Sequence, residues 1–126
     1  MTTETVEVRD LQENSYVMID EVPCRIADYT TSRPGKHGSA KARVEGKGVF
    51  DDKRRVFTAP VDAKIEQPRV RKRDGQIVNI DDSEVQVMDL ESYETFKIIA
   101  DGEDYKTDEE ITFLQFEENR RIVENG

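Results

Sequence analysis

Apolar and polar residues alternate along most of the chain, and this period of two predicts β-strands rather than helices. In the first half, the alternating segments are residues 15–19, 22–31, 40–44, 49–50 and 56–59. Within the second of them we expect Cys24, Ile26 and Tyr29 to face the core. Segments this short, separated by turn-forming residues, are typical of a small β-barrel.

Turn signals separate these predicted strands. Asp20 and Glu21 predict a tight turn, and residues 51–54 predict the tip of a hairpin. Gly46 and Gly48 predict a bend or a bulge, because glycine inside a strand often marks such a site. No stretch has a convincing helical period, so this half is predicted to form an SH3-like barrel.

The second half resumes the strand pattern after a break at Gln67 and Pro68, which a basic cluster at residues 69–75 follows directly. The acidic segment 101–110 predicts a loop or one short helical turn. The alternating segments are residues 76–80, 84–88, 95–99 and 111–116, with a closing strand at 120–123. This spacing fits an OB-fold. The predicted fold is therefore all-β, with an SH3-like barrel at residues 1–68 and an OB-fold barrel at residues 69–126.

Charge is distributed unevenly over the 126 residues. The net charge is −9, but residues 1–32 carry −5, residues 33–73 carry +8 and residues 74–126 carry −12. A basic middle in an acidic chain predicts contact with a polyanion such as RNA. The surplus of carboxylates is typical of proteins in concentrated salt, so a halophilic source is our hypothesis.

The single cysteine and the lack of long apolar runs indicate where the protein acts. The first residues show no basic segment followed by a hydrophobic one, so we expect no signal peptide. No apolar run is long enough to cross a bilayer. Cys24 excludes an intrachain disulfide and suits a reducing compartment. We expect a cytoplasmic protein without a membrane partner.

The segment 30–41 differs from the rest of the chain. Pro34 and Gly35 form a strong turn signal, because proline presets one dihedral and glycine allows a positive φ. Gly38 supplies a second unconstrained position. Lys36 and His37 are therefore predicted to lie at an exposed tip between two strands.

Four interpretations of this tip are open. It is a solvated turn that happens to hold a lysine, or an RNA-contacting lysine supported by nearby cations such as Arg33 and Lys41. A nucleotide phosphate loop needs Ser or Thr after the lysine and a following helix, which this sequence lacks. A metal or nucleophilic site would need more than His37 and Cys24, since one histidine and one cysteine cannot complete a four-ligand site.

Four segments together carry a family resemblance. They are Thr-Ser-Arg-Pro-Gly-Lys-His-Gly-Ser-Ala-Lys at 31–41, Val-Pro-Cys-Arg-Ile at 22–26, Asp-Gly-Gln-Ile at 74–77 and Val-Met-Asp-Leu-Glu-Ser-Tyr-Glu-Thr-Phe at 87–96. The first resembles the hypusine loop of translation initiation factor 5A in its archaeal form. The resemblance runs over roughly residues 8–123, and the family architecture is an SH3-like domain followed by an OB domain.

The resemblance implies a chemistry for the loop. Lys36 would receive an aminobutyl group from a polyamine through deoxyhypusine synthase, and no other cofactor is expected. The modified protein would bind the ribosome near the peptidyl-tRNA acceptor end and promote peptide-bond formation at proline runs, as the bacterial relative elongation factor P does. It would be a monomer and not an enzyme. The residues expected to form the modification loop and contact RNA are Arg33, Pro34, Gly35, His37, Gly38, Ser39, Lys41 and Arg43.

The loop also departs from the family pattern. Arg33 stands where many relatives have lysine, and Pro34 where eukaryotic members have threonine. Ser39 replaces a histidine typical of eukaryotic members, which leaves open whether Lys36 stops at deoxyhypusine or is hydroxylated. The alternative functions are a general RNA-binding or RNA-chaperone module with an unmodified loop and an acidic protein-interaction adaptor.

Overall fold

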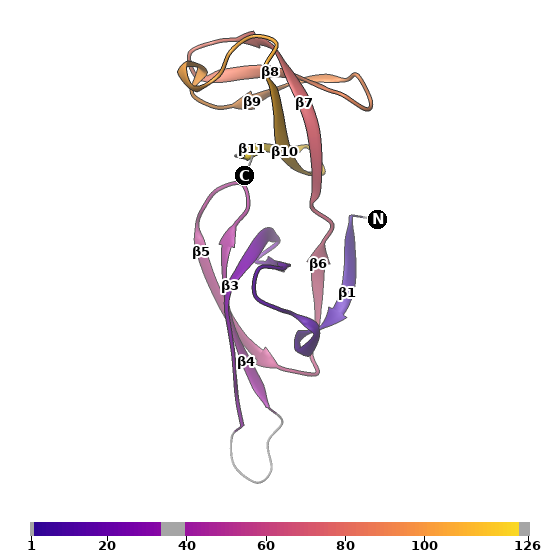
Figure 1. The fold of residues 1–126 in the computed structure, drawn as a ribbon. Helices are drawn as coiled ribbons and strands as arrows, with labels where there is room; N and C mark the ends of the chain where they lie inside the picture. Colours follow the sequence, from indigo (N-terminus) through magenta and orange to yellow (C-terminus); the bar gives the residue numbers. More distant parts are fainter. Residues whose placement is uncertain (1, 34–39, 124–126) are drawn as a thin grey trace. The chain divides into compact units, whose positions relative to one another are not determined.

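A computed structural model describes residues 2–33 and 40–123, which form strands, turns and two short 3-10 helices (Figure 1). The chain divides into two compact units, Met1–Arg69 and Val70–Gly126, called unit 1 and unit 2 below. No helix in the described parts is both long enough and apolar enough to cross a membrane.

Unit 1 is built from two antiparallel sheets. β1 pairs with β6, and a four-stranded sheet has the order β2-β3-β4-β5. Its elements are β1 (Thr3–Glu7), η1 (Val8–Asp10), β2 (Tyr16–Ile19), β3 (Val22–Ser32), β4 (Lys41–Gly48), β5 (Arg54–Pro60) and β6 (Lys64–Pro68). The side-chain amide of Gln67 on β6 donates to the carbonyl oxygen of Tyr16 on β2 at 3.0 Å, which links the two sheets.

The core of unit 1 follows the alternation seen in the sequence. On β4 every second residue is buried, while the residues between face solvent or are half-buried. Cys24 and Ile26 on β3 are fully or almost fully buried, and Tyr29 packs against the same cluster. The buried residues of this core are Val8, Leu11, Val17, Ile19, Cys24, Ile26, Ala42 and Val44.

The bulge in this sheet is not where the glycines predicted it. β4 continues through Gly46 and ends at Gly48, where the predicted bend is found. The register shift lies on the partner strand, between Ile26 and Asp28. Gly46 is needed for close approach instead: a Cβ there would lie 3.0 Å from both Cys24 Cβ and Ile19 Cδ1. The glycine lets β4 press against the core, so the expectation of a bulge at this residue was wrong.

Unit 2 is one antiparallel sheet with the order β11-β10-β7-β8-β9. Its elements are β7 (Arg71–Ile80), β8 (Glu84–Asp89), β9 (Thr95–Ile99), η2 (Gly102–Asp104), β10 (Glu110–Phe116) and β11 (Asn119–Val123). The two edge strands approach each other, and the guanidinium of Arg120 on β11 lies 3.9 Å from the ring centre of Phe96 on β9. The sheet therefore curls toward closure.

The core of unit 2 is apolar and includes one edge-to-face aromatic pair. Phe96 and Phe113 have ring centres 5.2 Å apart. Gly75 on β7 permits this packing, since a Cβ there would lie 2.6 Å from Val87 Cγ1. The buried residues of this core are Ile77, Val85, Val87, Ile98, Ile111 and Phe113.

These units confirm the all-β prediction. The pairing of β1 with β6 was missed, because it joins segments about sixty residues apart that carry no sequence signal for each other. The basic cluster after Pro68 was expected to precede the first strand of the second half. It is instead largely part of β7, which begins at Arg71.

Candidate functional site

The predicted loop is carried by the β3–β4 hairpin. The paired ends of its strands are Ser32 opposite Lys41, Thr31 opposite Ala42, and Thr30 opposite Arg43. Figure 1 shows these two strands side by side, extending beyond the other strands of unit 1. The six residues 34–39 lie between them and outside the described residues.

The base of the hairpin is anchored in the core. The Tyr29 hydroxyl donates to the carbonyl oxygen of Val8 at 3.1 Å, which ties β3 to η1. Val44, which is opposite Tyr29, is fully buried. Ala42, two residues nearer the tip on the same strand, is also fully buried. Because both strands are also held by the ladder, the stem is a firm support for whatever its loop carries.

Cations and hydroxyl groups share the outer face of the stem. Lys41 and Arg43 are exposed on this face. The register places Ser32 beside Lys41, and Thr30 and Thr58 on either side of Arg43. Hydroxyl groups and cations are the side chains that contact phosphate and sugar in nucleic-acid complexes. The three hydroxyl residues were not among the predicted contacts. The run Thr-Thr-Ser before Arg33 was a sequence signal for Thr30 and Ser32, but nothing in the sequence pointed to Thr58.

Two carboxylates reduce the positive charge of this face: Glu45, and Asp28, which is directly paired with Glu45. Glu45 Oε1 lies 3.8 Å from an Arg43 guanidinium nitrogen and also accepts a hydrogen bond from Arg54. The hydrogen bond from Arg54 lowers the pKa of Glu45 below its ordinary value, with a further contribution from Arg43. Two guanidinium groups thus share one carboxylate, which leaves positive charge in surplus.

Three of the predicted loop and RNA-contact residues can be placed. Arg33, Lys41 and Arg43 are exposed at the end of the hairpin. The other predicted residues lie outside the described residues, and their roles stay predictions: Pro34, Gly35, Lys36, His37, Gly38 and Ser39.

Cys24 does not fit the metal or nucleophile interpretation. Its side chain is fully buried, and burial raises the pKa of the thiol, so the neutral form is favoured. The thiolate is the form that binds metals and attacks electrophiles. Within residues 2–33 and 40–123, no group of three His, Cys, Asp or Glu side chains is placed to hold a metal ion.

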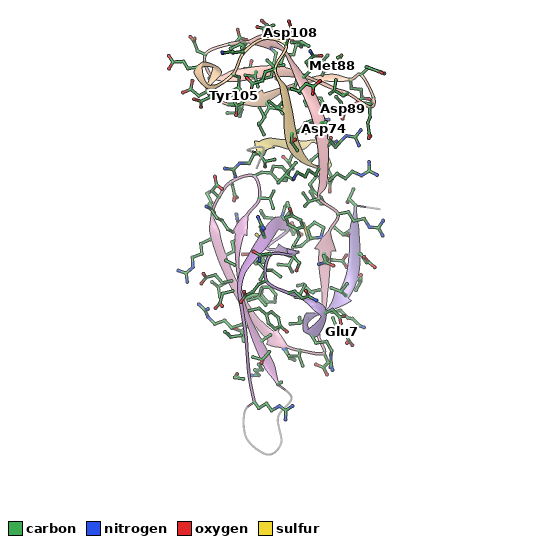
Figure 2. The ribbon with its side chains drawn as sticks, in the orientation of Figure 1. Glu7, Asp74, Met88, Asp89, Tyr105 and Asp108 are labelled. Atoms are coloured by element: carbon green, nitrogen blue, oxygen red, sulfur yellow. The ribbon has the colours of Figure 1, made fainter. Side chains whose placement is uncertain are left out.

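Unit 2 contains a buried ion pair that the sequence did not reveal. Asp89, which Figure 2 labels at the end of β8, is 3% exposed and accepts hydrogen bonds from the Arg73 guanidinium. It also accepts from the backbone N–H groups of Glu91 and Ser92 at 2.8 and 3.1 Å. The Arg73 hydrogen bond is the first cause that lowers the pKa of Asp89 to about 2. The carboxylate fixes the β8–β9 turn and has a structural role.

Comparison with known proteins gives this hairpin its context. A family model described as "Translation initiation factor 5A-like, N-terminal" matches residues 1–63. Translation initiation factor 5A of Halorubrum lacusprofundi is 52% identical over 124 residues, which are 98% of this chain and 99% of the relative. The chain belongs to the translation initiation factor 5A family. It is therefore a translation factor by family.

Other relatives and solved structures agree with this assignment. The Natronomonas pharaonis factor is 54% identical over 98% of this chain and its own full length, and most of the similar relatives are from halophilic archaea. The structure titled "Eukaryotic translation initiation factor 5A from Methanococcus jannaschii" has a TM-score of 0.89 and 40% identity, covering 97% of this chain and 93% of its own. The predicted order of an SH3-like barrel followed by an OB-fold barrel is thereby confirmed.

Proposed function

We propose that this factor binds the ribosome near the peptidyl-tRNA acceptor end and promotes peptide-bond formation at stalled or proline-rich sequences. The working group is Lys36, extended by an aminobutyl group. The observation that supports this most is the stem: a family-typical lysine loop stands on a hairpin whose base is anchored in the core and whose end carries exposed Lys41 and Arg43. The protein would act in the cytoplasm as a monomer.

The modification is proposed to occur on the lysine Nζ. A C–N bond forms between Nζ and the aminobutyl carbon, a C–N bond of the polyamine breaks, and the remainder of the donor leaves as a free amine. Deoxyhypusine synthase is the expected partner in this step. The side chain becomes longer and carries two amines, which donate to phosphate and ribose oxygens.

The mechanism is one of positioning. A long side chain on a firm stem can reach into a crowded RNA pocket and hold the acceptor end of the tRNA. Ordering a reactant in this way lowers the entropic part of the barrier to its reaction. The chemistry would belong to the ribosome, so the factor is not proposed to be an enzyme. Where concentrated salt screens long-range attraction, binding would rest on such direct contacts.

The test replaces Lys36 by arginine. Lys36→Arg keeps the positive charge and the fold but offers no lysine Nζ to modify. Cells that depend on this variant should lose synthesis of a reporter with a proline run, while a reporter without the run is made normally. Lys64→Arg, at an exposed lysine on β6, is the matched control and should behave as the unchanged protein.

Normal synthesis of the proline reporter with Lys36→Arg would contradict the proposal. It would favour the general RNA-binding module, in which the loop works without modification. Loss of both reporters would point to a broader translation defect and would also contradict the specific role at proline runs.

A further inference from the structure

A row of four side chains crosses the outer face of the β2-β3-β4-β5 sheet. The register sets Tyr16 opposite Arg25, Arg25 opposite Lys47, and Lys47 opposite Arg54. Directly paired residues of antiparallel strands point to the same face. The three cations are exposed and the tyrosine is half-buried, whereas Cys24, next to Arg25 on the other face, is fully buried. These four residues are called the cross-strand row below.

The row brings like charges together. Like charges directly opposite each other in neighbouring strands weaken their pairing. Lys47 Nζ lies 3.8 Å from Asp52 Oδ1, with 63% and 50% of the two side chains exposed, and Arg54 pairs with Glu45. Arg25 forms no ion pair with any residue in 2–33 or 40–123. The repulsion among these cations lowers the stability of the sheet, and the ion pairs of Lys47 and Arg54 offset it only in part. Such a cost is expected where a ligand binds.

The row is separate from the modification loop. Lys47 follows Lys41 by six residues on the same strand, which corresponds to roughly 20 Å. Between the two lie Asp28 and Glu45, which are directly paired and carry negative charge. A ligand on the row therefore does not contact the same groups as one at the end of the hairpin.

We propose that the cross-strand row is a second RNA-contact surface, which binds the phosphodiester backbone of one RNA strand and stacks one unpaired base. Its three cations neutralise phosphates, and guanidinium groups do so with two parallel hydrogen bonds. The half-buried Tyr16 is the aromatic residue of the row on which a base would stack. This inference rests on the proposed function, since it takes RNA as the partner, and adds a contact that does not need Lys36.

The combination of ring and cations favours RNA over an acidic protein. An acidic partner would require the cations alone, and any part of the sheet with exposed Lys and Arg would serve it. A tyrosine ring in line with three cations is suited to a nucleic acid, which has both bases that stack and several phosphate charges. Binding to single-stranded nucleic acid without sequence preference uses this pair of elements.

The test uses the full chain with unmodified Lys36 and a fluorescently labelled single-stranded RNA of mixed sequence. Affinity is measured over a salt titration. Replacing Arg25, Lys47 and Arg54 together by glutamine should reduce the slope of log K against log salt by about 2, because three phosphate contacts are lost. Lys64→Gln, at a cation of β6 outside the row, should leave the slope unchanged.

Unfolding is excluded as the cause by a second measurement. The triple variant should keep its melting temperature, because the loss of two exposed ion pairs is offset by the loss of the like-charge repulsion. Tyr16→Ala should weaken binding about tenfold at fixed salt without changing the slope, and Tyr16→Phe should retain the affinity. A triple variant with the slope of Lys64→Gln, or a Tyr16→Ala variant that binds normally, overturns the proposal. The proposal is also overturned if the triple variant loses binding to an acidic protein but still binds the RNA with unchanged affinity.

The outcomes separate this proposal from the proposed function. The assay uses unmodified protein, so unchanged RNA binding by the row variants leaves the role of Lys36 in translation untouched. Conversely, a bare Lys36 in growing cells would remove the proposed mechanism while the row could still bind RNA. Each idea thus fails on its own measurement.

Discussion

The two units are similar in architecture but opposite in electrostatic character. Unit 1, residues 1–69, has as many acidic as basic residues and is neutral by count, whereas unit 2, residues 70–126, carries the whole net charge of −9. In unit 1 several cations lie on the outer face of the β2-β3-β4-β5 sheet and at the end of the β3–β4 hairpin. The proposed RNA contacts therefore lie on unit 1, and the net negative charge of the chain is a property of unit 2.

The units also differ in the burial of a carboxylate that is bound by an arginine through two hydrogen bonds. In unit 1, Asp51 pairs with Arg55 across a turn at 2.9 Å, and 35% of the Asp51 side chain is exposed. In unit 2, the side chains of Asp89 and Arg73 are 4% and 17% exposed, and the Asp89 carboxylate accepts from two backbone N–H groups, whereas Asp51 accepts from one. Removing one partner of a buried pair costs far more than removing one at the surface.

The largest expected effect is therefore on unit 2. Asp89→Ala should lower the stability of unit 2 by about 3 kcal/mol, because it leaves two backbone N–H groups without their acceptor and leaves the half-buried Arg73 guanidinium with only the exposed Glu91 as its partner. Asp51→Ala is the matched variant in unit 1 and should cost much less. A denaturant titration monitored by two-dimensional NMR measures the free energy of unfolding of each unit separately. Equal losses of stability from the two variants would refute this contrast.

Acid should act through the same carboxylate. The pKa of Asp89 is lowered from 3.8 to about 2, first by the Arg73 hydrogen bond. Because the pKa is lower in the folded state, the carboxylate stabilises the folded state at pH values above its unfolded-state pKa. This stability is lost as the pH falls from about 4 to about 2. Amide signals of unit 2 should report the loss over that range. In Asp89→Asn, which starts from lower stability, the pH dependence over this range should be weaker, and an unchanged dependence would exclude Asp89 as its cause.

Salt should shift the two units by different amounts. Salt screens the repulsion among the acidic residues of unit 2, and unit 1 has no net charge to screen. The melting temperature of unit 2 should rise with added KCl and that of unit 1 should change little. Equal shifts in both units would show that net charge is not the origin of the salt response.

The smallest effect is expected from single charge reversals in unit 2. Glu103→Lys, at an exposed residue of η2, should change RNA or ribosome binding by less than about twofold, because surface substitutions away from special features rarely exceed 0.5 kcal/mol. Co-sedimentation with ribosomes gives the measurement. A large gain or loss would assign RNA contact to unit 2 and break the division between the units.

The sequence revealed the strands well because alternation is a local signal. β4 follows its expected pattern. The turn between β4 and β5 lies earlier than predicted: Val49 and Phe50, expected in a strand, are in the turn, and Arg54, expected at the tip, begins β5. Long-range pairings were not visible: nothing near Thr3 points to Pro68, its partner in the β1–β6 ladder. The bulge was misplaced because the glycine signal for a bulge and for close packing is the same.

The candidate site was only partly visible in the sequence. Lys41 and Arg43 could be predicted because they alternate with small or apolar residues on one strand. The cross-strand row could not, since its four members come from four strands and only the register unites them. The burial of Asp89 was also hidden, because an acidic residue in an acidic chain is expected at the surface.

The most direct test of the central claim is the mass of the Lys36 peptide, taken from the protein isolated from its native host during growth. We predict an addition equal to one aminobutyl group, with or without one oxygen, localised to the Lys36 side chain in most molecules. A peptide with unmodified Lys36 in actively translating cells would contradict the account.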